Sequence, residues 1–194
     1  MSGLGLDLTV VVPAFNEEER LLPTLRRLIP WLREQGRSFE VLVVDDGSTD
    51  RTAAVAADFA RTNLEVAVVS LGRNRGKGAA VREGFARSHG RLVLFSDADL
   101  STPIEELLRL LAELEGGADL VMASRGLRAS NIVVHQAWYR EFMGKTFNLI
   151  VRLVTGIPHH DTQCGFKLLR GEDARALAGE MREDGFAFDV EAIL

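Results

Sequence analysis

The sequence has little cysteine and no long apolar segment. Cys164 is its single cysteine, so the chain cannot form an internal disulfide, and this favours a reducing compartment such as the cytoplasm. No stretch approaches the roughly 18 consecutive apolar residues that a membrane-spanning helix needs. The first residues also lack the basic region and the apolar run of a signal peptide. We therefore expect a cytoplasmic protein without a spanning helix.

Basic residues are in deficit as well. The chain has 23 Lys and Arg residues against 28 Asp and Glu residues, a net charge of -5 at pH 7. A protein that coats nucleic acid needs a basic excess to neutralise phosphates, so we expect no nucleic-acid partner. Phosphate recognition must then be local. The length of 194 residues and the 46% hydrophobic content predict one domain, residues 1–194, with a substantial core.

Two glycine-rich phosphate loops are missing. A dinucleotide-binding domain requires a glycine-rich turn after its first strand, whereas that turn here reads PAFNEEE, residues 13–19. The segment GRNRGKGAA differs from a P-loop, which has four residues between its glycines and Ser or Thr after its lysine. Here Gly78 follows Lys77. Gly76 and Gly78 either let the backbone approach a ligand or give flexibility where a helix begins.

Short apolar runs alternate with helical periodicities along the first two thirds of the chain. The runs are rich in β-branched residues, as in strands buried on both faces. This alternation predicts an α/β fold, Rossmann-like, with a doubly wound and mainly parallel sheet flanked by helices. The expected strands are residues 8–13, 39–45, 64–70, 91–96 and 118–124. Four helices are expected: residues 21–32, a segment that ends near residue 60, residues 77–88 and residues 102–114. Ser48 or Asp50 is expected to cap the second of these. The fourth has Pro103 in its first turn, and its apolar face consists of Ile104, Leu107, Leu108, Leu111 and Leu114.

The pattern loosens beyond Arg125. Residues 138–154 have a helical pattern that is apolar over more than one face. Such a helix either covers the sheet or forms part of an apolar acceptor groove. The chain ends at FAFDVEAIL, inside an expected helix, which is typical of a sequence that lacks its C-terminal part.

Acidic residues follow two of the expected strands, at the sheet edge where parallel sheets bind ligands. Of Asp45 and Asp46, we expect one to cap a turn or helix and one to accept hydrogen bonds from a ribose or base. Asp97 and Asp99 are alternate residues of an extended segment, about 6.6 Å apart, with the small Ala98 leaving room beside them. The pair can share a divalent ion with a diphosphate. Alternatively, both are solvated acids that cap the next helix.

Several motifs together resemble the GT-A fold glycosyltransferases of family 2. In chain order they are TVVVPAFNEEERLLPTL, EVLVVDDGSTDRT, NRGKGAAVREGF, LVLFSDADLSTP and ASRG, followed by HHDTQCGFKLLR and FAFDVE. The resemblance covers about residues 8–194. Within the family, the motifs are similar to those of the members that glycosylate dolichyl phosphate and other polyprenyl phosphates.

This resemblance implies an inverting transfer of glucose or mannose from a nucleoside-diphosphate sugar, UDP-glucose or GDP-mannose, to a polyprenyl phosphate. It implies Mg²⁺ or Mn²⁺ on Asp97 and Asp99, where the ion acts as a Lewis acid on the leaving diphosphate. A lipid acceptor implies peripheral association with the cytoplasmic face of a membrane. The donor-binding residues implied are Pro13, Ala14, Asn16, Glu17, Asp45, Asp46, Lys77 and Asp97.

The acceptor side has two interpretations. Arg125 is suited to pair with a phosphate, because a guanidinium matches its oxygens, and Arg128 and Arg140 are candidates to position the acceptor phosphate. An ionised phosphate monoester needs no general base. If the acceptor is instead a hydroxyl, a base is required, and Asp161 is the acid that the motif places there.

Two other function classes remain open. A nucleotidyltransferase also joins a nucleotide-binding sheet to a metal-bound carboxylate, but is expected to carry a glycine-rich basic loop after its first strand. A non-enzymatic sugar-nucleotide-binding module would not release nucleoside diphosphate. We expect no chemistry from His159 and His160, which lack ligand partners at a suitable spacing, or from Cys164, a small packed side chain. Asp189 is expected to position the C-terminal helix.

Overall fold

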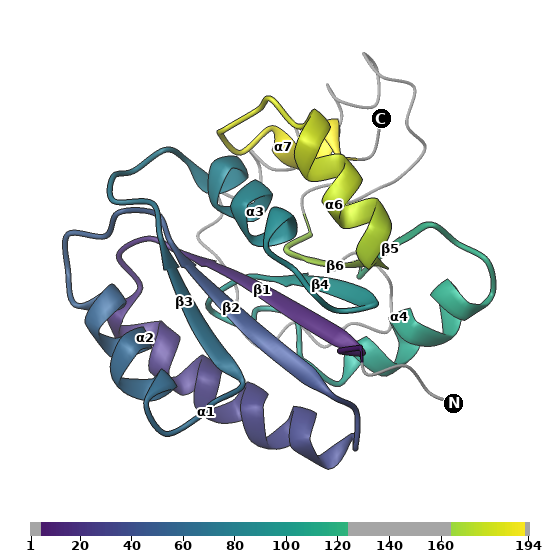
Figure 1. The fold of residues 1–194 in the computed structure, drawn as a ribbon, viewed down its shortest axis with the longest axis horizontal. Helices are drawn as coiled ribbons and strands as arrows, with labels where there is room; N and C mark the ends of the chain where they lie inside the picture. The colour runs from purple at the N-terminus through teal and green to yellow at the C-terminus, as the bar shows by residue number, and fades with distance from the viewer. Residues whose placement is uncertain (1–4, 124–163, 193–194) are drawn as a thin grey trace, which may run out of the picture.

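The computed structural model describes residues 5–123 and 164–192, which contain a six-stranded sheet with the order β3-β2-β1-β4-β6-β5 (Figure 1). The strands are β1 (Leu8–Ala14), β2 (Phe39–Asp45), β3 (Val66–Ser70), β4 (Leu92–Ser96), β5 (Leu120–Met122) and β6 (Phe166–Arg170). The helices are α1 (Glu18–Glu34), α2 (Thr52–Ala60), α3 (Lys77–Ala86), α4 (Glu106–Glu115), α6 (Gly171–Glu180) and α7 (Phe188–Glu191).

The four strands β3, β2, β1 and β4 are parallel, as the alternating pattern predicts. Alternate residues of β1 enter two separate cores, because successive side chains of a strand point to opposite faces. Val10 and Val12 pack with apolar residues of α1, α2 and α4, whereas Val11 packs with residues of α3, α6 and α7. The two helical layers on either side of the sheet in Figure 1 make it doubly wound.

Strand β6 was missed by the sequence analysis. It lies between β4 and β5 and pairs antiparallel with both, so the expected fifth strand does not contact β4 directly. The segment FKLLR carries Lys167 at its second position, and a lysine in an apolar run obscures the strand pattern. In the structure this lysine is almost fully buried, at 2% exposure. Helix α6, directly after β6, was not predicted either.

Helix α4 begins later than its sequence pattern predicts. Pro103 lies ahead of the helix, in a turn closed by the Glu106 N–H donating to the Pro103 carbonyl at 3.1 Å. The expected apolar face is also partly wrong. Leu108 is 53% exposed, whereas Leu110, which was not assigned to that face, is buried. None of the helices in the described ranges is both long and apolar enough to cross a bilayer.

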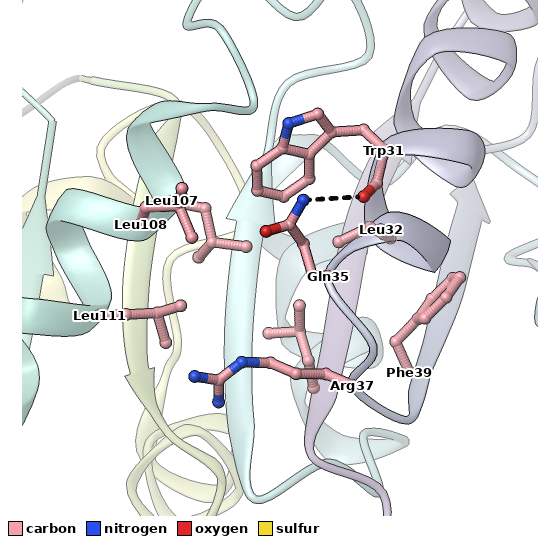
Figure 2. Close-up of a pocket in the computed structure, with 9 residues that line it drawn as sticks. Trp31, Leu32, Gln35, Arg37, Phe39, Leu107, Leu108 and Leu111 are labelled. Atoms are coloured by element: carbon pink, nitrogen blue, oxygen red, sulfur yellow. Dashed lines mark hydrogen bonds between the residues drawn. The ribbon is translucent and has the colours of Figure 1, made fainter.

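A small apolar crevice separates the C-terminal part of α1 from α4 (Figure 2). Gln35 is among its lining residues and donates from Nε2 to the Trp31 carbonyl at 3.1 Å. Leu8 and Phe39, the first residues of β1 and β2, also line it. The crevice therefore lies at the amino ends of these strands, at the edge opposite to the acidic motifs.

Candidate active site

The loops that follow β1 and β2 are joined by hydrogen bonds at the carboxyl edge of the sheet. The Asn16 N–H donates to Ser48 Oγ at 3.0 Å, and Asn16 Oδ1 accepts from the Thr49 N–H at 2.9 Å. Asn16 has φ 54°, in the left-handed region that asparagine tolerates better than most residues. Its side chain, predicted to line the donor, therefore fixes the two loops to each other. Ser48 is not the cap of α2.

A second set of bonds joins the starts of α1 and α2. The Glu17 N–H donates to Thr52 Oγ1 at 2.7 Å, and the Glu18 N–H donates to Asp50 Oδ2 at 3.2 Å. In return, the Arg51 N–H donates to Glu18 Oε2 at 2.9 Å. Asp50 Oδ1 also accepts from the Thr52 N–H at 2.9 Å, so Asp50, one residue before the N-cap Arg51, supplies a side-chain acceptor for the start of α2. Side chains thus satisfy backbone donors at both helix starts.

Asp45 and Asp46 are both buried, at 3% exposure, and both accept hydrogen bonds within the protein. Asp45 accepts from the Ser48 N–H at 3.1 Å and from Ser70 Oγ at 3.2 Å. Asp46 accepts from the backbone N–H groups of residues 75 and 76, at 2.7 and 2.9 Å. Asp45 therefore caps the local turn at residues 45–48, whereas Asp46 holds a loop that is distant in the chain. A contact of either carboxylate with a nucleoside stays a prediction.

Gly76 is the residue before α3 and has φ 103°, a conformation that favours glycine where a helix begins, as one alternative predicts. A Cβ added at Gly76 would overlap the Asp184 carbonyl, and one at Gly78 would overlap the Glu183 carbonyl. The Ala79 N–H donates to the Asp184 carbonyl at 3.2 Å. These glycines therefore also allow the protein's own C-terminal segment to cross the start of α3, and a close approach of a ligand stays a prediction.

Asp97 and Asp99 do not lie on an extended strand as predicted. Strand β4 ends at Ser96, and the Leu100 N–H donates to the Asp97 carbonyl at 3.2 Å, which closes a turn over residues 97–100. Leu100, which follows the two central residues of this turn, has φ 45°, in the left-handed region that is uncommon for a leucine. The Asp99 side chain is exposed, and its Oδ1 accepts from the Ser101 N–H at 2.9 Å. Asp99 thus caps its own turn, seven residues before the first residue of α4, and does not cap that helix.

Ala98, between the two aspartates, packs in the apolar core. It is buried, and its carbonyl accepts from Thr24 Oγ1 of α1 at 2.6 Å. Because this bond fixes the centre of the turn to α1, the flanking carboxylates have a defined position.

Lys77 provides a cationic partner for Asp97. Its Nζ lies 2.7 Å from Asp97 Oδ1, and each side chain is 22% exposed. Gly165 backs the carboxylate: the Asp97 N–H donates to the Gly165 carbonyl at 2.9 Å, and a Cβ on Gly165 would overlap Asp97 Oδ2. A donor-binding residue and a metal-binding residue of the sequence analysis are thereby brought into direct contact.

The charges of Asp97 and Asp99 both affect the pKa of Glu17. Burial raises the pKa of its carboxyl; the Arg20 guanidinium, 2.7 Å away, lowers it, and the charges of Asp99 and Asp97 raise it further. Within residues 5–123 and 164–192, no group of three His, Cys, Asp or Glu side chains is arranged to hold a metal ion. Two hard carboxylates in a region of accumulated negative charge nevertheless fit Mg²⁺ or Mn²⁺, provided that the ligand supplies the remaining oxygens.

A second ion pair, between Lys167 and Asp189, lies close to the pair of Lys77 and Asp97. The Lys167 ammonium pairs with Asp189 of α7 and also donates to the Cys164 carbonyl at 2.9 Å. Both charged side chains are buried, at 3% and 4% exposure. Burial raises the pKa of Asp189, while Lys167 and Lys77 lower it. The sequence analysis missed Lys167, although FKLLR and FAFDVE place Lys167 and Asp189 among apolar residues. Asp189 positions the C-terminal helix and Cys164 is packed in the interior, as predicted.

The acceptor half of the predicted site cannot be placed in the same way. The residues assigned to it lie outside the described ranges. They are Arg125, Arg128, Arg140 and Asp161. The expected helix 138–154 also lies outside these ranges, as do His159 and His160, from which no chemistry was expected.

Comparison with known proteins identifies the family. The model of "Glycosyl transferase family 2" matches residues 9–177. A dolichyl-phosphate beta-glucosyltransferase of Drosophila melanogaster is 35% identical over 202 residues, covering 97% of this chain and 62% of that protein. An undecaprenyl-phosphate 4-deoxy-4-formamido-L-arabinose transferase of Pseudomonas paraeruginosa is 39% identical over 170 residues, covering 87% of this chain and 48% of that protein. The chain thus spans about three fifths or less of the length of these relatives.

Solved structures establish the fold. A glucosyl-3-phosphoglycerate synthase from Mycobacterium tuberculosis, in complex with Mn²⁺, UDP-glucose and phosphoglyceric acid, superposes with a TM-score of 0.68 at 24% identity, covering 97% of this chain and 64% of that chain. A mannosyl-3-phosphoglycerate synthase from Rubrobacter xylanophilus gives a TM-score of 0.63 at 23% identity, over 86% of this chain and 54% of that chain. The expected GT-A architecture is confirmed, and with the family model matched over most of its length, the chain belongs to glycosyl transferase family 2.

Proposed function

We propose that the protein transfers a hexose, glucose or mannose, from a nucleoside-diphosphate sugar to a polyprenyl phosphate, with a divalent metal and inversion at the anomeric carbon. The observation that carries this proposal is the contact of Lys77 with Asp97 beside Asp99 at the carboxyl edge of the sheet. The strand order reverses there, between β1 and β4, and such switch points bind ligands in α/β sheets. The names of the relatives, which refer to dolichyl and undecaprenyl phosphates, support the acceptor class.

The donor would lie across the loops that follow β1, β2 and β4. The buried ends of β1 and β2, Pro13, Ala14 and Asp45, would form the floor of the nucleoside site, and the joined loops at Asn16 and Glu17 its wall. All five belong to the donor-binding residues expected from the resemblance.

Asp97 and Asp99 would hold Mg²⁺ or Mn²⁺ together with oxygens of the diphosphate. The bound ion would act as a Lewis acid on the leaving diphosphate. Lys77, a point charge with three donors, is placed to bind a diphosphate oxygen once it separates from Asp97.

The acceptor phosphate would be the nucleophile. One of its oxygens forms the bond to the anomeric carbon as the bond to the donor diphosphate breaks, and this single in-line displacement inverts the anomeric configuration. Arg125, Arg128 and Arg140 would position the phosphate, and no proton needs to be removed because the monoester is ionised at neutral pH. Only a hydroxyl acceptor would need Asp161 as a base.

Radiolabelled transfer tests the proposal. UDP-glucose and GDP-mannose are each offered with a short polyprenyl phosphate and with a panel of hydroxyl acceptors, and we expect product only with the lipid phosphate. Arg140→Ala should reduce transfer strongly and spare donor binding, whereas Asp161→Asn should not abolish transfer. Transfer to a hydroxyl with none to the phosphate would make Asp161 the base. Release of hexose 1-phosphate, the product left when the nucleotidyl group of the donor is transferred, would indicate a nucleotidyltransferase. No turnover of the donor would indicate a binding module.

Asp46→Ala tests the donor half separately. The substitution leaves two partly buried backbone N–H groups of the 72–76 loop without their acceptor, which costs about 1 kcal/mol or more and frees the loop before Lys77. We expect binding of UDP or GDP, measured by calorimetric titration, to weaken about tenfold, because roughly 1.4 kcal/mol of positioning is lost. Asp161→Ala is the comparison and should leave the affinity nearly unchanged. Equal losses in the two variants would show that the donor and acceptor halves are wrongly assigned.

A further inference from the structure

Two ion pairs, Lys77–Asp97 and Lys167–Asp189, lie near two phenylalanine rings at the start of α3. Phe95 and Phe188 pack edge to face, with their ring centroids 5.7 Å apart. The Lys77 ammonium lies 5.2 Å from the Phe95 centroid, and that of Lys167 lies 5.5 Å from it. One lysine pairs with Asp97 and the other with a carboxylate of α7. Both ammonium groups are thus fixed between an aromatic face and an acid.

The buried Lys167–Asp189 pair limits the choice of anions with which Lys77 can form an ion pair. The charge of Lys77 acts on Asp189, but Lys167 already pairs with that carboxylate. Asp189 therefore attracts Lys77, but Lys167 already forms the ion pair with this carboxylate that Lys77 would need. A new anion has to arrive before Lys77 can leave Asp97 at little cost.

Lys77 also affects any cation that approaches Asp97. The ammonium lies 2.7 Å from a carboxylate oxygen, in a site that is only 22% exposed, so solvent screens the interaction incompletely. At such separations it would repel a divalent ion that approaches the same carboxylate.

We propose that Lys77 is a tethered counter-ion that competes with the divalent cation for Asp97, and that the donor diphosphate relieves this competition by drawing Lys77 to itself. The inference rests on the proposed metal-dependent function and adds to it an order of binding, in which tight binding of the metal requires the nucleotide. Metal alone binds weakly, and metal and nucleotide strengthen each other's binding, because a coupling between two ligands is reciprocal.

Direct titration of Mn²⁺, followed by the electron paramagnetic resonance signal of the free ion, tests the proposal without an activity assay. The titration is done on the full chain alone and with saturating UDP or GDP. Lys77→Met keeps an apolar stem against the rings and removes the charge. It should bind Mn²⁺ about tenfold more tightly than the parent in the absence of nucleotide. It should also lose most of the gain that the nucleotide gives the parent.

Two controls separate this contact from a general effect of charge. Lys77→Arg keeps the cation and should leave Mn²⁺ binding weak in the absence of nucleotide. Arg75→Gln removes an exposed charge from the same loop and should change the affinity by less than about twofold. Lys77→Gln repeats the measurement if the methionine variant melts at a lower temperature than the parent.

The outcomes distinguish this inference from the proposed function. If the parent binds Mn²⁺ with nucleotide but Lys77→Met binds it no more tightly without nucleotide, competition is excluded and the metal-dependent function stands. If Lys77→Met gains affinity while no hexose is transferred to a polyprenyl phosphate, the competition stands and the acceptor assignment fails. If neither protein binds Mn²⁺ under any of these conditions, both are overturned.

Discussion

Asp97→Asn should abolish hexose transfer and remove the metal-dependent stabilisation that a nucleoside-diphosphate sugar gives the protein. The variant loses both the carboxylate proposed to bind the metal and the partner of Lys77. We expect transfer to fall by at least about a thousandfold, or roughly 4 kcal/mol in the activation barrier, because the leaving diphosphate is no longer neutralised. Asp99→Asn should behave similarly, although its side chain is exposed and holds only its own turn.

Thermal shift measures this result directly. A ligand at a hundred times its dissociation constant stabilises the native state by about 2.7 kcal/mol, so the parent should melt several degrees higher with UDP-glucose or GDP-mannose and Mn²⁺ than with either component alone. Both variants should lose this difference. Asp119→Asn, which removes an exposed carboxylate next to β5, is the matched control and should keep it. An unchanged shift in Asp97→Asn and Asp99→Asn would exclude a metal bridge at the turn after β4.

Lys167→Met should destabilise the protein by about 3–5 kcal/mol at neutral pH, because it leaves the Asp189 carboxylate buried without its cation. Urea unfolding measures the loss. Arg87→Met, which removes an exposed i,i+4 pair with Glu83, should cost less than about 1 kcal/mol. The double variant Lys167→Met/Asp189→Leu should recover most of the loss, since an apolar pair can replace a buried ion pair.

The pH dependence of this loss has a definite sign. Burial already raises the pKa of Asp189 above its ordinary value, and loss of Lys167, which lowers it, raises it further. Below that raised pKa but above the ordinary value, the native state binds more protons than the unfolded state, so acid stabilises the native state through this group. The difference between the parent and Lys167→Met should therefore shrink as the pH falls from neutral into this range. A deficit that is independent of pH, or one no larger than that of Arg87→Met, would show that the charge of Asp189 does not cause it.

Sequence patterns predict the parallel half of the sheet well, because each strand there is a short apolar run that ends in a polar turn. The runs at β1 and β2 agree with the structure to within one residue. The pattern fails at β6, where Lys167 stands in the interior, since the acid that compensates it lies 22 residues away in the chain. Local periodicity contains no information about such a partner.

The candidate site shows the same division. Its acidic residues could be selected from sequence because strand ends in a parallel sheet converge at one edge. The contact of Lys77 with Asp97 could not, because it depends on the turn at Ala98 and on the absence of a side chain at Gly165. The same is true of Gly76 and Gly78, whose neighbours come from residues 183–184. Sequence identified the residue types, and tertiary contacts decide which of them meet.

The place of β6 in the sheet also affects the order in which the protein folds during synthesis. Strands β1 to β4 pair with one another, so this half of the sheet can form as soon as β4 has left the ribosome. Strand β5 is made next, but within the described sheet it pairs only with β6, which follows after the 123–165 segment. Until residues 166–170 emerge, β4 presents an open edge whose N–H and C=O groups can pair with another chain. The nascent chain is therefore most vulnerable to misassembly during the interval in which β4 waits for its last neighbour.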